Sequence, residues 1–206
     1  KKIAKYVNSS ASEIYDKSTT LYGIKHARNS MAREDRCYLV EGYLDVLSLH
    51  QLGITNAVAS SGTALTKGQI RLIRKFTDNV TIMYDGDMPG IKAALKGINL
   101  LLQEGLRVKV VLIPDGDDPD SYSRKHTLAE VRAFISSHEE DFLDFKAGLL
   151  SEDAGSDPLK RADMINEMAD TIALIQDPVT RSVYAQNISM RFSLDQAVIG
   201  ARINKV

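Results

Sequence analysis

Between positions 38 and 137, short apolar runs alternate with amphipathic segments that are long enough to form helices. This alternation restricts the fold more than any other feature, because it is typical of a parallel sheet whose strands are joined by helical crossovers. Each crossover is short, as expected for right-handed connections within one sheet. The pattern predicts four strands at 38–40, 56–59, 80–84 and 108–113, and three intervening helices at 45–51, 67–76 and 90–104.

The pattern changes after Glu139, where strand signals stop and helix-start signals take their place. The Asp-Pro pairs at 157–158 and 177–178 each put a capping residue before a proline that suits the first helical position. Ser193 begins a capping-box pattern that would start a third helix. Apolar residues at helical spacing across 165–175 would form the buried face of a small helical bundle.

These patterns divide the chain into three parts. We expect an N-terminal extension at 1–36, an α/β domain at 37–138 with a mostly parallel four-stranded sheet covered by helices, and a C-terminal helical subdomain at 139–206. The 206 residues are 44% hydrophobic, which is enough for a buried core.

The composition limits the cellular compartment and the binding partners that we expect for the chain. Lysine and arginine number 26 against 27 aspartate and glutamate, so the net charge gives no overall attraction to nucleic acid or lipid. A single cysteine, Cys37, cannot form an internal disulfide, and no apolar run approaches the roughly 20 residues that span a bilayer. We expect a cytoplasmic protein with no membrane contact. Because the sequence does not start with methionine, we also expect a fragment of a longer protein.

Acidic residues follow three of the four predicted strands. Glu41 comes after the first strand, Asp85 and Asp87 after the third, and Asp118 and Asp120 after the fourth. Open parallel sheets bind ligands beyond the carboxyl ends of their strands, and carboxylates gathered there would repel one another unless hard cations such as Mg²⁺ lay between them. Any one cluster is equally consistent with an ordinary turn. The recurrence at three strand ends favours a functional site.

Two of these clusters carry a recognisable motif. The segment VEGYLD at 40–45, followed by YDGD at 84–87, resembles the signature of the Toprim superfamily, which includes primases, topoisomerases, certain nucleases and recombination mediators. Further segments resemble bacterial primases in the same order along the chain: 5–9, 21–24 with Ala27, 58–66, and 114–120 with 124–126. The likeness covers about positions 5–127, and the helical remainder has no comparably specific motif.

The resemblance implies roles for the acidic residues. Asp85, Asp87, Asp118 and Asp120 match positions that bind divalent metal ions. Glu41 matches a glutamate assigned to metal binding or acid–base chemistry, and Asp45 matches a supporting carboxylate. The implied cofactor is Mg²⁺, with Mn²⁺ able to substitute. In the two-metal chemistry that it implies, one ion activates the attacking hydroxyl and the other stabilises the leaving oxygens.

The resemblance also implies residues that bind template or nucleotide. Lys5, Asn8 and Lys17 match positions linked to these ligands, although by residue type alone both lysines would be solvated surface residues. Backbone amides at Gly62 and Thr63 could contact phosphate, but that loop is equally consistent with a simple strand-to-helix turn.

The function implied by the resemblance is template-directed synthesis of RNA primers from ribonucleoside triphosphates on single-stranded DNA. The implied partners include a replicative helicase, contacted through a domain that this sequence lacks. The fragment alone is expected to be inactive, since upstream core residues would be needed to hold the substrates.

Three alternatives stay open at this point. A Toprim nuclease or topoisomerase would use the same acids to cleave phosphodiesters. An aspartyl-phosphate phosphohydrolase has a similar strand-end motif, but it normally continues with Gly-Thr or a similar pair where this chain has Met88 and Pro89. A non-enzymatic Toprim assembly module commonly lacks part of the acidic set, which this chain retains.

Overall fold

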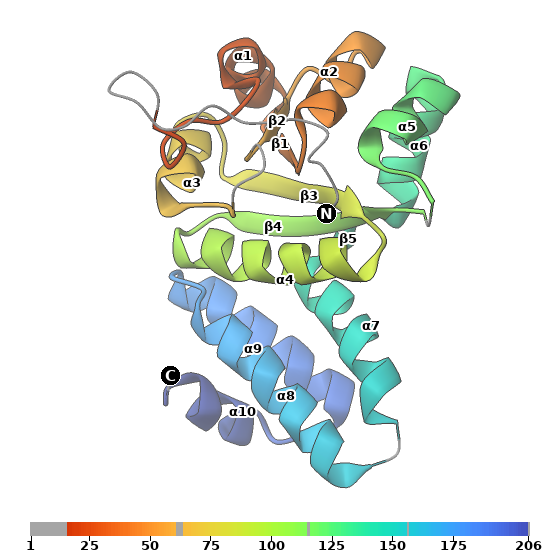
Figure 1. Cartoon of the computed structure of the whole chain (residues 1–206). Helices are drawn as coiled ribbons and strands as arrows, with labels where there is room; N and C mark the ends of the chain where they lie inside the picture. The colour runs from red at the N-terminus through yellow and green to blue at the C-terminus, as the bar shows by residue number, and fades with distance from the viewer. Residues whose placement is uncertain (1–15, 61–63, 115, 156, 206) are drawn as a thin grey trace, which may run out of the picture.

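The computed structural model describes residues 16–60, 64–114, 116–155 and 157–205, without the side chains of 152–154. A five-stranded sheet with the strand order β2-β1-β3-β4-β5 lies at the centre of the α/β part (Figure 1). The first four strands are parallel, which confirms the predicted α/β class. The strands are β1 (Cys37–Val40), β2 (Ala57–Ala59), β3 (Asn79–Asp85), β4 (Arg107–Ile113) and β5 (Glu140–Asp141).

The fifth strand corrects the prediction of a four-stranded sheet. Strand β5 pairs with β4 in the antiparallel direction, with Lys109 opposite Asp141 and Val110 opposite Glu140. Its two acidic residues give no apolar strand signal, and the strand lies beyond the point where the sequence pattern turns helical. The pairing depends on the backbone, because β4 would otherwise leave its outer edge unpaired there.

Helices cover both faces of the sheet, and the alternating strand residues point into two separate cores. Tyr38 and Val40 of β1 face the core beneath α2 (Tyr43–Leu52), α5 (Pro119–Lys125) and α6 (Leu128–His138). Cys37 and Leu39 face the opposite core, beneath α1 (Ile24–Glu34), α3 (Lys67–Arg74) and α4 (Met88–Gln103). The helices α2, α3 and α4 confirm the three predicted between the strands.

The C-terminal part is helical, as predicted. It contains α7 (Phe142–Ala154), α8 (Pro158–Ala173), α9 (Pro178–Phe192) and α10 (Gln196–Ile203). The side chains of Asp157 and Asp177 cap α8 and α9 as expected. The capping box predicted at Ser193 is wrong: Ser193 ends α9 with a φ of 55°, and Asp195 caps α10 instead by accepting the Ala197 N–H at 2.7 Å. Because Ser193 supplies the left-handed residue that ends one helix, the next helix can begin only after it.

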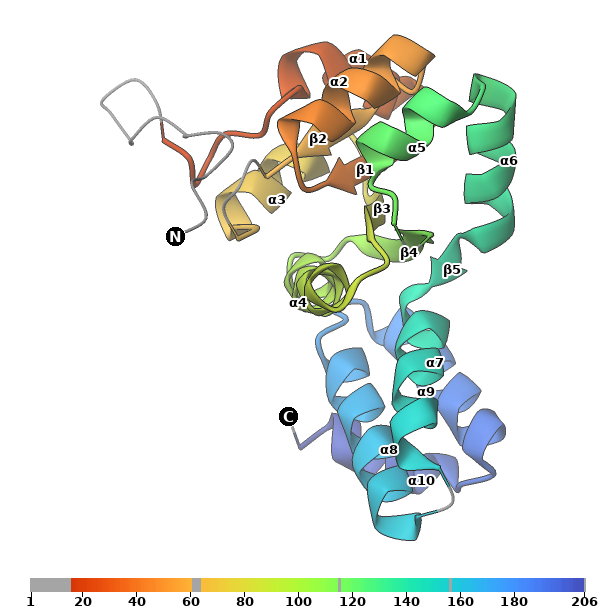
Figure 2. The ribbon, with the colours of Figure 1, turned by 45° about the vertical axis from the view of Figure 1, so that its right-hand side comes forward.

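The helical subdomain shares a core with the sheet. Figure 2 shows α4 between the strands and the helices α7 to α10. Buried Ile98 and Leu101 of α4 belong to the same apolar cluster as Met168 and Ile172 of α8. Among the residues that the structure describes, no helix combines the length and apolar content that a bilayer-spanning segment requires.

The order of the strands positions the site. Strand β1 lies between β2 and β3, so the chain moves to one side of β1 and then crosses to the other. Such a reversal opens a crevice beyond the carboxyl ends of the two strands that flank it. Here those strands are β1 and β3, which end at the Glu41 and Asp85 motifs.

Candidate active site

A cavity of about 990 Å³ lies at this reversal point. Glu41 after β1, Asp85 at the end of β3 and Asp118 before α5 all line it, together with Asp45 from the first turn of α2. The structure therefore brings acidic residues from all three predicted strand ends to one opening.

The turn after β3 is held in a tight conformation. Asp85 is the last residue of β3, and Asp87 caps α4 by accepting the Gly90 N–H at 2.8 Å. A Cβ atom at Gly90 would lie 2.3 Å from the Asp85 carbonyl oxygen, which is inside any tolerable contact. Only glycine lets α4 begin this close to the strand, so position 90 fixes where Asp85 and Asp87 stand relative to each other.

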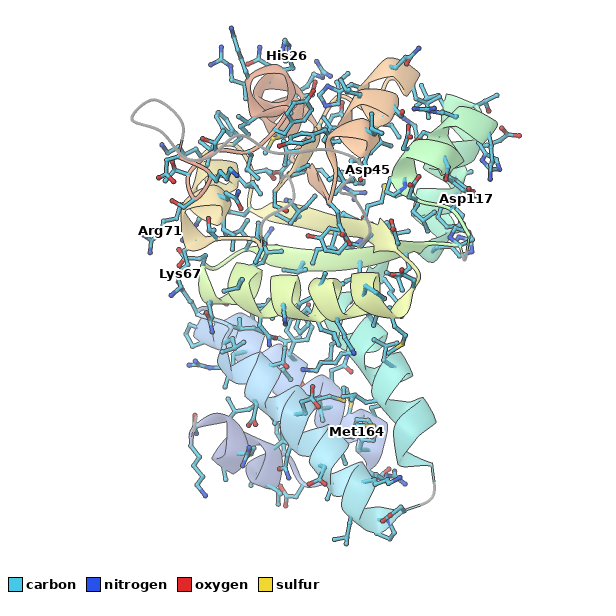
Figure 3. The ribbon with its side chains drawn as sticks, in the orientation of Figure 1. His26, Asp45, Lys67, Arg71, Asp117 and Met164 are labelled. Atoms are coloured by element: carbon cyan, nitrogen blue, oxygen red, sulfur yellow. The ribbon has the colours of Figure 1, made fainter. Side chains whose placement is uncertain are left out.

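Asp45 joins two of the strand ends through its carboxylate. One oxygen accepts the Gly42 N–H at 2.8 Å and the other accepts the Asp120 N–H at 3.2 Å. The residue is only 8% exposed, and Figure 3 shows it between α2 and α5. Asp45 thus links the segment after β1 to the start of α5, which follows β4.

Lost hydration and like charges raise the pKa values of the cavity acids. Removal of water raises the pKa of Glu41 to about 7, and the charges of Asp85, Asp45 and Asp87 act in the same direction. Burial raises the pKa of Asp45 to about 6 despite the N–H group of Gly42, which lowers it. Burial, followed by the charges of Asp118 and Asp87, also raises the pKa of Asp85.

Few positive charges compensate these acids. In the described part of the chain, no lysine or arginine forms an ion pair with Glu41, Asp45, Asp85, Asp87 or Asp118. Raised pKa values and missing counter-ions are both expected where a cation is to be bound.

The donor set fits a hard divalent cation that is bound in part by other molecules. All the donors are carboxylate oxygens, which Mg²⁺ and Mn²⁺ prefer. Among the described residues, however, no three acidic, histidine or cysteine side chains converge closely enough to hold an ion by themselves. Magnesium is commonly held by one or two carboxylates plus water and substrate phosphate, so this spread of donors suits an ion shared with a phosphorylated ligand.

The structure separates the two acids that precede and begin α5. Asp118 lines the cavity while its side chain caps α5 by accepting the Ser121 N–H at 2.7 Å. Asp120 instead accepts a hydrogen bond from Ser48 of α2 and pairs with Arg124 at 2.8 Å. Asp120 does not line the cavity, and its carboxylate is engaged by the protein itself.

The expected template and nucleotide residues are only partly described. Lys17 lies in a turn against α3, where its carbonyl accepts a hydrogen bond from Gln69 Nε2 at 2.9 Å, and it does not line the cavity. Lys5, Asn8, Gly62 and Thr63 lie outside the described residues.

Two cavity residues were not predicted from the sequence. Lys92 and Lys96 of α4 line the same opening as the acids. Their spacing of four residues puts both side chains on one helical face, but this becomes informative only once α4 is known to start at the acidic turn. Lys67 and Arg71 also share a face, on α3, yet Figure 3 shows both at the outer side of the molecule, and Arg71 pairs with Glu104 at 2.8 Å.

Comparison with known proteins gives a consistent picture. Residues 38–123 match the profile of a family described as Toprim-like, and residues 150–197 match one described as the DnaB-helicase binding domain of primase. A DNA primase of Clostridium acetobutylicum is 37% identical over 199 residues, which are 95% of this chain and 32% of that protein.

Solved structures agree with the sequence matches. A DNA primase domain from Pseudomonas aeruginosa has a TM-score of 0.87 at 30% identity, covering 97% of this chain and 64% of the other. A DnaG primase catalytic domain bound to single-stranded DNA has a TM-score of 0.84 at 31% identity, covering 95% and 63%. The chain spans about a third of the length of the curated relatives it matches, at 32% in both Clostridium acetobutylicum and Staphylococcus aureus.

Proposed function

Because this chain belongs to the bacterial DNA primase family, we propose that it supplies the acidic, metal-binding part of an enzyme that makes short RNA primers on single-stranded DNA. The observation that carries the proposal is the meeting of Glu41, Asp85 and Asp118 around one cavity without paired cations. The matched relatives and structures are primases, so they lend no support to a nuclease, a topoisomerase, a phosphohydrolase or a non-enzymatic module.

The acids around the cavity have two proposed roles: most of them bind the divalent cation, and one positions the cation-binding residues. We assign divalent-cation binding to Glu41, Asp85 and Asp118, assisted by Asp87, which caps α4 and does not itself line the cavity. Asp120 stays in the proposed set, although its carboxylate would first have to leave Ser48 and Arg124. Mg²⁺, or Mn²⁺ in its place, would activate the attacking 3′-hydroxyl and stabilise charge on the leaving pyrophosphate.

Asp45 and Glu41 have different roles in this proposal. Asp45 is a positioning residue, because both of its carboxylate oxygens already accept backbone N–H groups. The pKa of Glu41 is raised to about 7, so this carboxyl can take up a proton near neutral pH and would release it when a cation binds.

The template and the nucleotide would be held by residues around this centre. We keep Lys5, Asn8, Lys17, Gly62 and Thr63 as proposed contacts with template or triphosphate. The chain alone is proposed to be inactive, because in-line reaction requires the template and both nucleotides to be fixed, and the matched relatives carry more chain to do so.

The helical subdomain is the proposed contact for a replicative helicase, contrary to the expectation that this contact lies in a domain that the sequence lacks. Residues 150–197 match a profile described as helicase-binding. Within them, Val179, Val183 and Met190 of α9 are 70%, 60% and 69% exposed and fall on one helical face. Exposed apolar residues grouped in this way are typical of protein-binding surfaces. Val183→Lys should weaken helicase binding in a pull-down, and undiminished binding would remove α9 from the interface.

Two measurements test the proposed function. Titration with Mn²⁺ should show binding to the chain that Asp85→Asn weakens strongly, with Asp78→Asn, directly before the opposite end of β3, as the matched control. Primer synthesis on single-stranded DNA should be absent with residues 1–206 alone and appear when the preceding core segment of a relative is joined to them. Failure to bind Mn²⁺ would contradict the cation site, and primer synthesis by the chain alone would contradict the proposed need for upstream residues.

A further inference from the structure

The cavity has two chemically different walls. The acids gather at the strand ends, whereas Lys92 and Lys96 stand on α4. Both lysines are exposed, and among the described residues neither forms an ion pair. The described part of the cavity lining therefore contains two positive charges without ion pairs in addition to a group of acids without ion pairs.

The position of α4 determines how the lysines face the opening. The helix starts at Met88, directly after the acidic turn, and contributes cavity residues from Pro89 to Leu100. At 1.5 Å rise per residue this wall is about 16 Å long, and Lys92 and Lys96 are about 6 Å apart along it. An extended anion with several charges could contact both lysines while one of its ends lies near the acids.

The rest of the wall suits a nucleotide rather than a bare anion. Ala93 and Gly97 are small residues that leave space beside the lysines, and Leu65 and Leu100 add apolar surface to the cavity lining. A volume of about 990 Å³ is at the upper end of what small-molecule sites have, so it can hold a whole nucleoside triphosphate.

We propose that Lys92 and Lys96 form the polyphosphate subsite for the incoming ribonucleoside triphosphate. This assignment rests on the proposed primer synthesis in the same cavity. The acids alone would repel a triphosphate, whereas two ammonium groups one helical turn apart attract successive phosphates. The lysines bind the ligand and leave the acids free to hold cations.

Calorimetric titration of the chain with ATP, and separately with inorganic tripolyphosphate, both with Mg²⁺ present, tests the subsite. Hydrogen bonds to charged groups suggest that Lys92→Ala or Lys96→Ala weakens ATP binding about tenfold and the double variant about a hundredfold. Tripolyphosphate should lose a similar factor, and Lys96→Arg should retain most of the affinity. The matched control is Lys75→Ala, an exposed lysine at the end of α3 that does not line the cavity.

Because all these side chains are exposed, the variants should keep the wild-type circular dichroism. Equal ATP affinity in the wild type and the double variant would overturn the proposal. So would a double variant that loses binding of a single-stranded oligonucleotide but keeps that of ATP, since the lysines would then contact the template.

Primer synthesis by the joined chain distinguishes the lysine subsite from the proposed function. In the chain joined to an upstream core segment, the double variant should raise the KM for ATP and change kcat little. Active primer synthesis with an unchanged KM would overturn the lysine subsite alone. Lysine-dependent ATP binding without any primer synthesis would overturn the function and leave the subsite standing.

Discussion

The carboxyl ends of the strands and the helical subdomain differ in how their acidic residues are paired with cations. In the helical subdomain, acids have cationic partners: Glu167 pairs with Lys146 at 3.0 Å, and Asp144 pairs with Arg191 at 2.6 Å. At the carboxyl ends of the strands, lost hydration and the charge of Asp85 raise the pKa of Glu41, and neither residue has such a partner among the described residues. The contrast separates charges that serve the fold from charges held for a ligand, although both regions share one apolar core.

The largest expected effect is a loss of activity when an acid at the carboxyl end of β3 is replaced. In the chain joined to an upstream core segment, Asp85→Asn should lower primer synthesis by about 10³-fold, equivalent to about 4 kcal/mol of transition-state stabilisation. The amide keeps the shape and loses the charge that holds a cation, so the unfolding transition should stay intact. Unchanged primer yield at saturating Mg²⁺ would show that Asp85 carries no cation. Asp87→Asn should behave in the same way.

The next effect is on stability and comes from the helical subdomain. Met168 is fully buried, and Met168→Ala should lower the free energy of unfolding by about 3 kcal/mol through the cavity it creates. Urea denaturation measures this loss, and Met190→Ala, at 69% exposed, should change stability by less than about 0.5 kcal/mol. A single unfolding transition for the whole chain would support a shared core, whereas two separate unfolding transitions would contradict it.

A smaller effect should depend on pH. The pKa of Glu41 is about 7 in the fold against an ordinary value of 4.5, so its ionised form is disfavoured by folding. The resulting penalty is absent below pH 4.5 and grows as the pH rises through about 7. Glu41→Gln should therefore stabilise the cation-free chain at about pH 8 by on the order of 1 kcal/mol, because solvent screens part of the effect, and should change nothing at about pH 4.

Denaturation curves of Glu41→Gln at the two pH values, with and without Mn²⁺, provide the measurement. Mn²⁺ should stabilise the wild type at the higher pH and remove the advantage of the glutamine. A variant that is less stable than the wild type at high pH would mean that the Glu41 carboxylate stabilises the fold.

The smallest effect is expected at a buried charge of the helical subdomain. Lys146 is 4% exposed and donates to Thr171 at 2.6 Å besides pairing with Glu167. The partner side chain of Glu167 is 53% exposed and stays hydrated when the lysine is removed, so Lys146→Met, which fills a similar space, should alter the free energy of unfolding by less than about 1 kcal/mol. A large loss would mean that ion pairs, and not packing alone, stabilise this subdomain.

The sequence was most informative where periodicity and burial agree. Four strands and the caps at Asp157 and Asp177 were predicted because apolar runs and Asp-Pro pairs are local signals. Strand β5 was missed because a Glu-Asp pair becomes a strand only beside β4. The start of α10 was misplaced because the need for a left-handed residue at Ser193 depends on where α9 ends.

The candidate site, like the fold, was predicted from the sequence only in part. That acids at three strand ends would meet followed from the topology of parallel strands, and Glu41, Asp85 and Asp118 do line one cavity. The turning of Asp120 toward Ser48 and Arg124 was not predictable, since it depends on how α5 packs against α2. Lys92 and Lys96 were passed over because nothing in sequence alone says which face of α4 borders the cavity.

The carboxylate of Asp45 has a further consequence for turnover. Its two oxygens accept hydrogen bonds from the backbone N–H groups of Gly42 and Asp120. These bonds connect the segment that carries Glu41 with the segment that carries Asp118, and both residues are proposed cation ligands. The spacing between those ligands is thus set once, when the chain folds, and need not be reorganised in each catalytic cycle. The site is therefore preorganised before a substrate binds. We expect the reaction rate to depend on the alignment of the substrates and not on a rearrangement of the cavity.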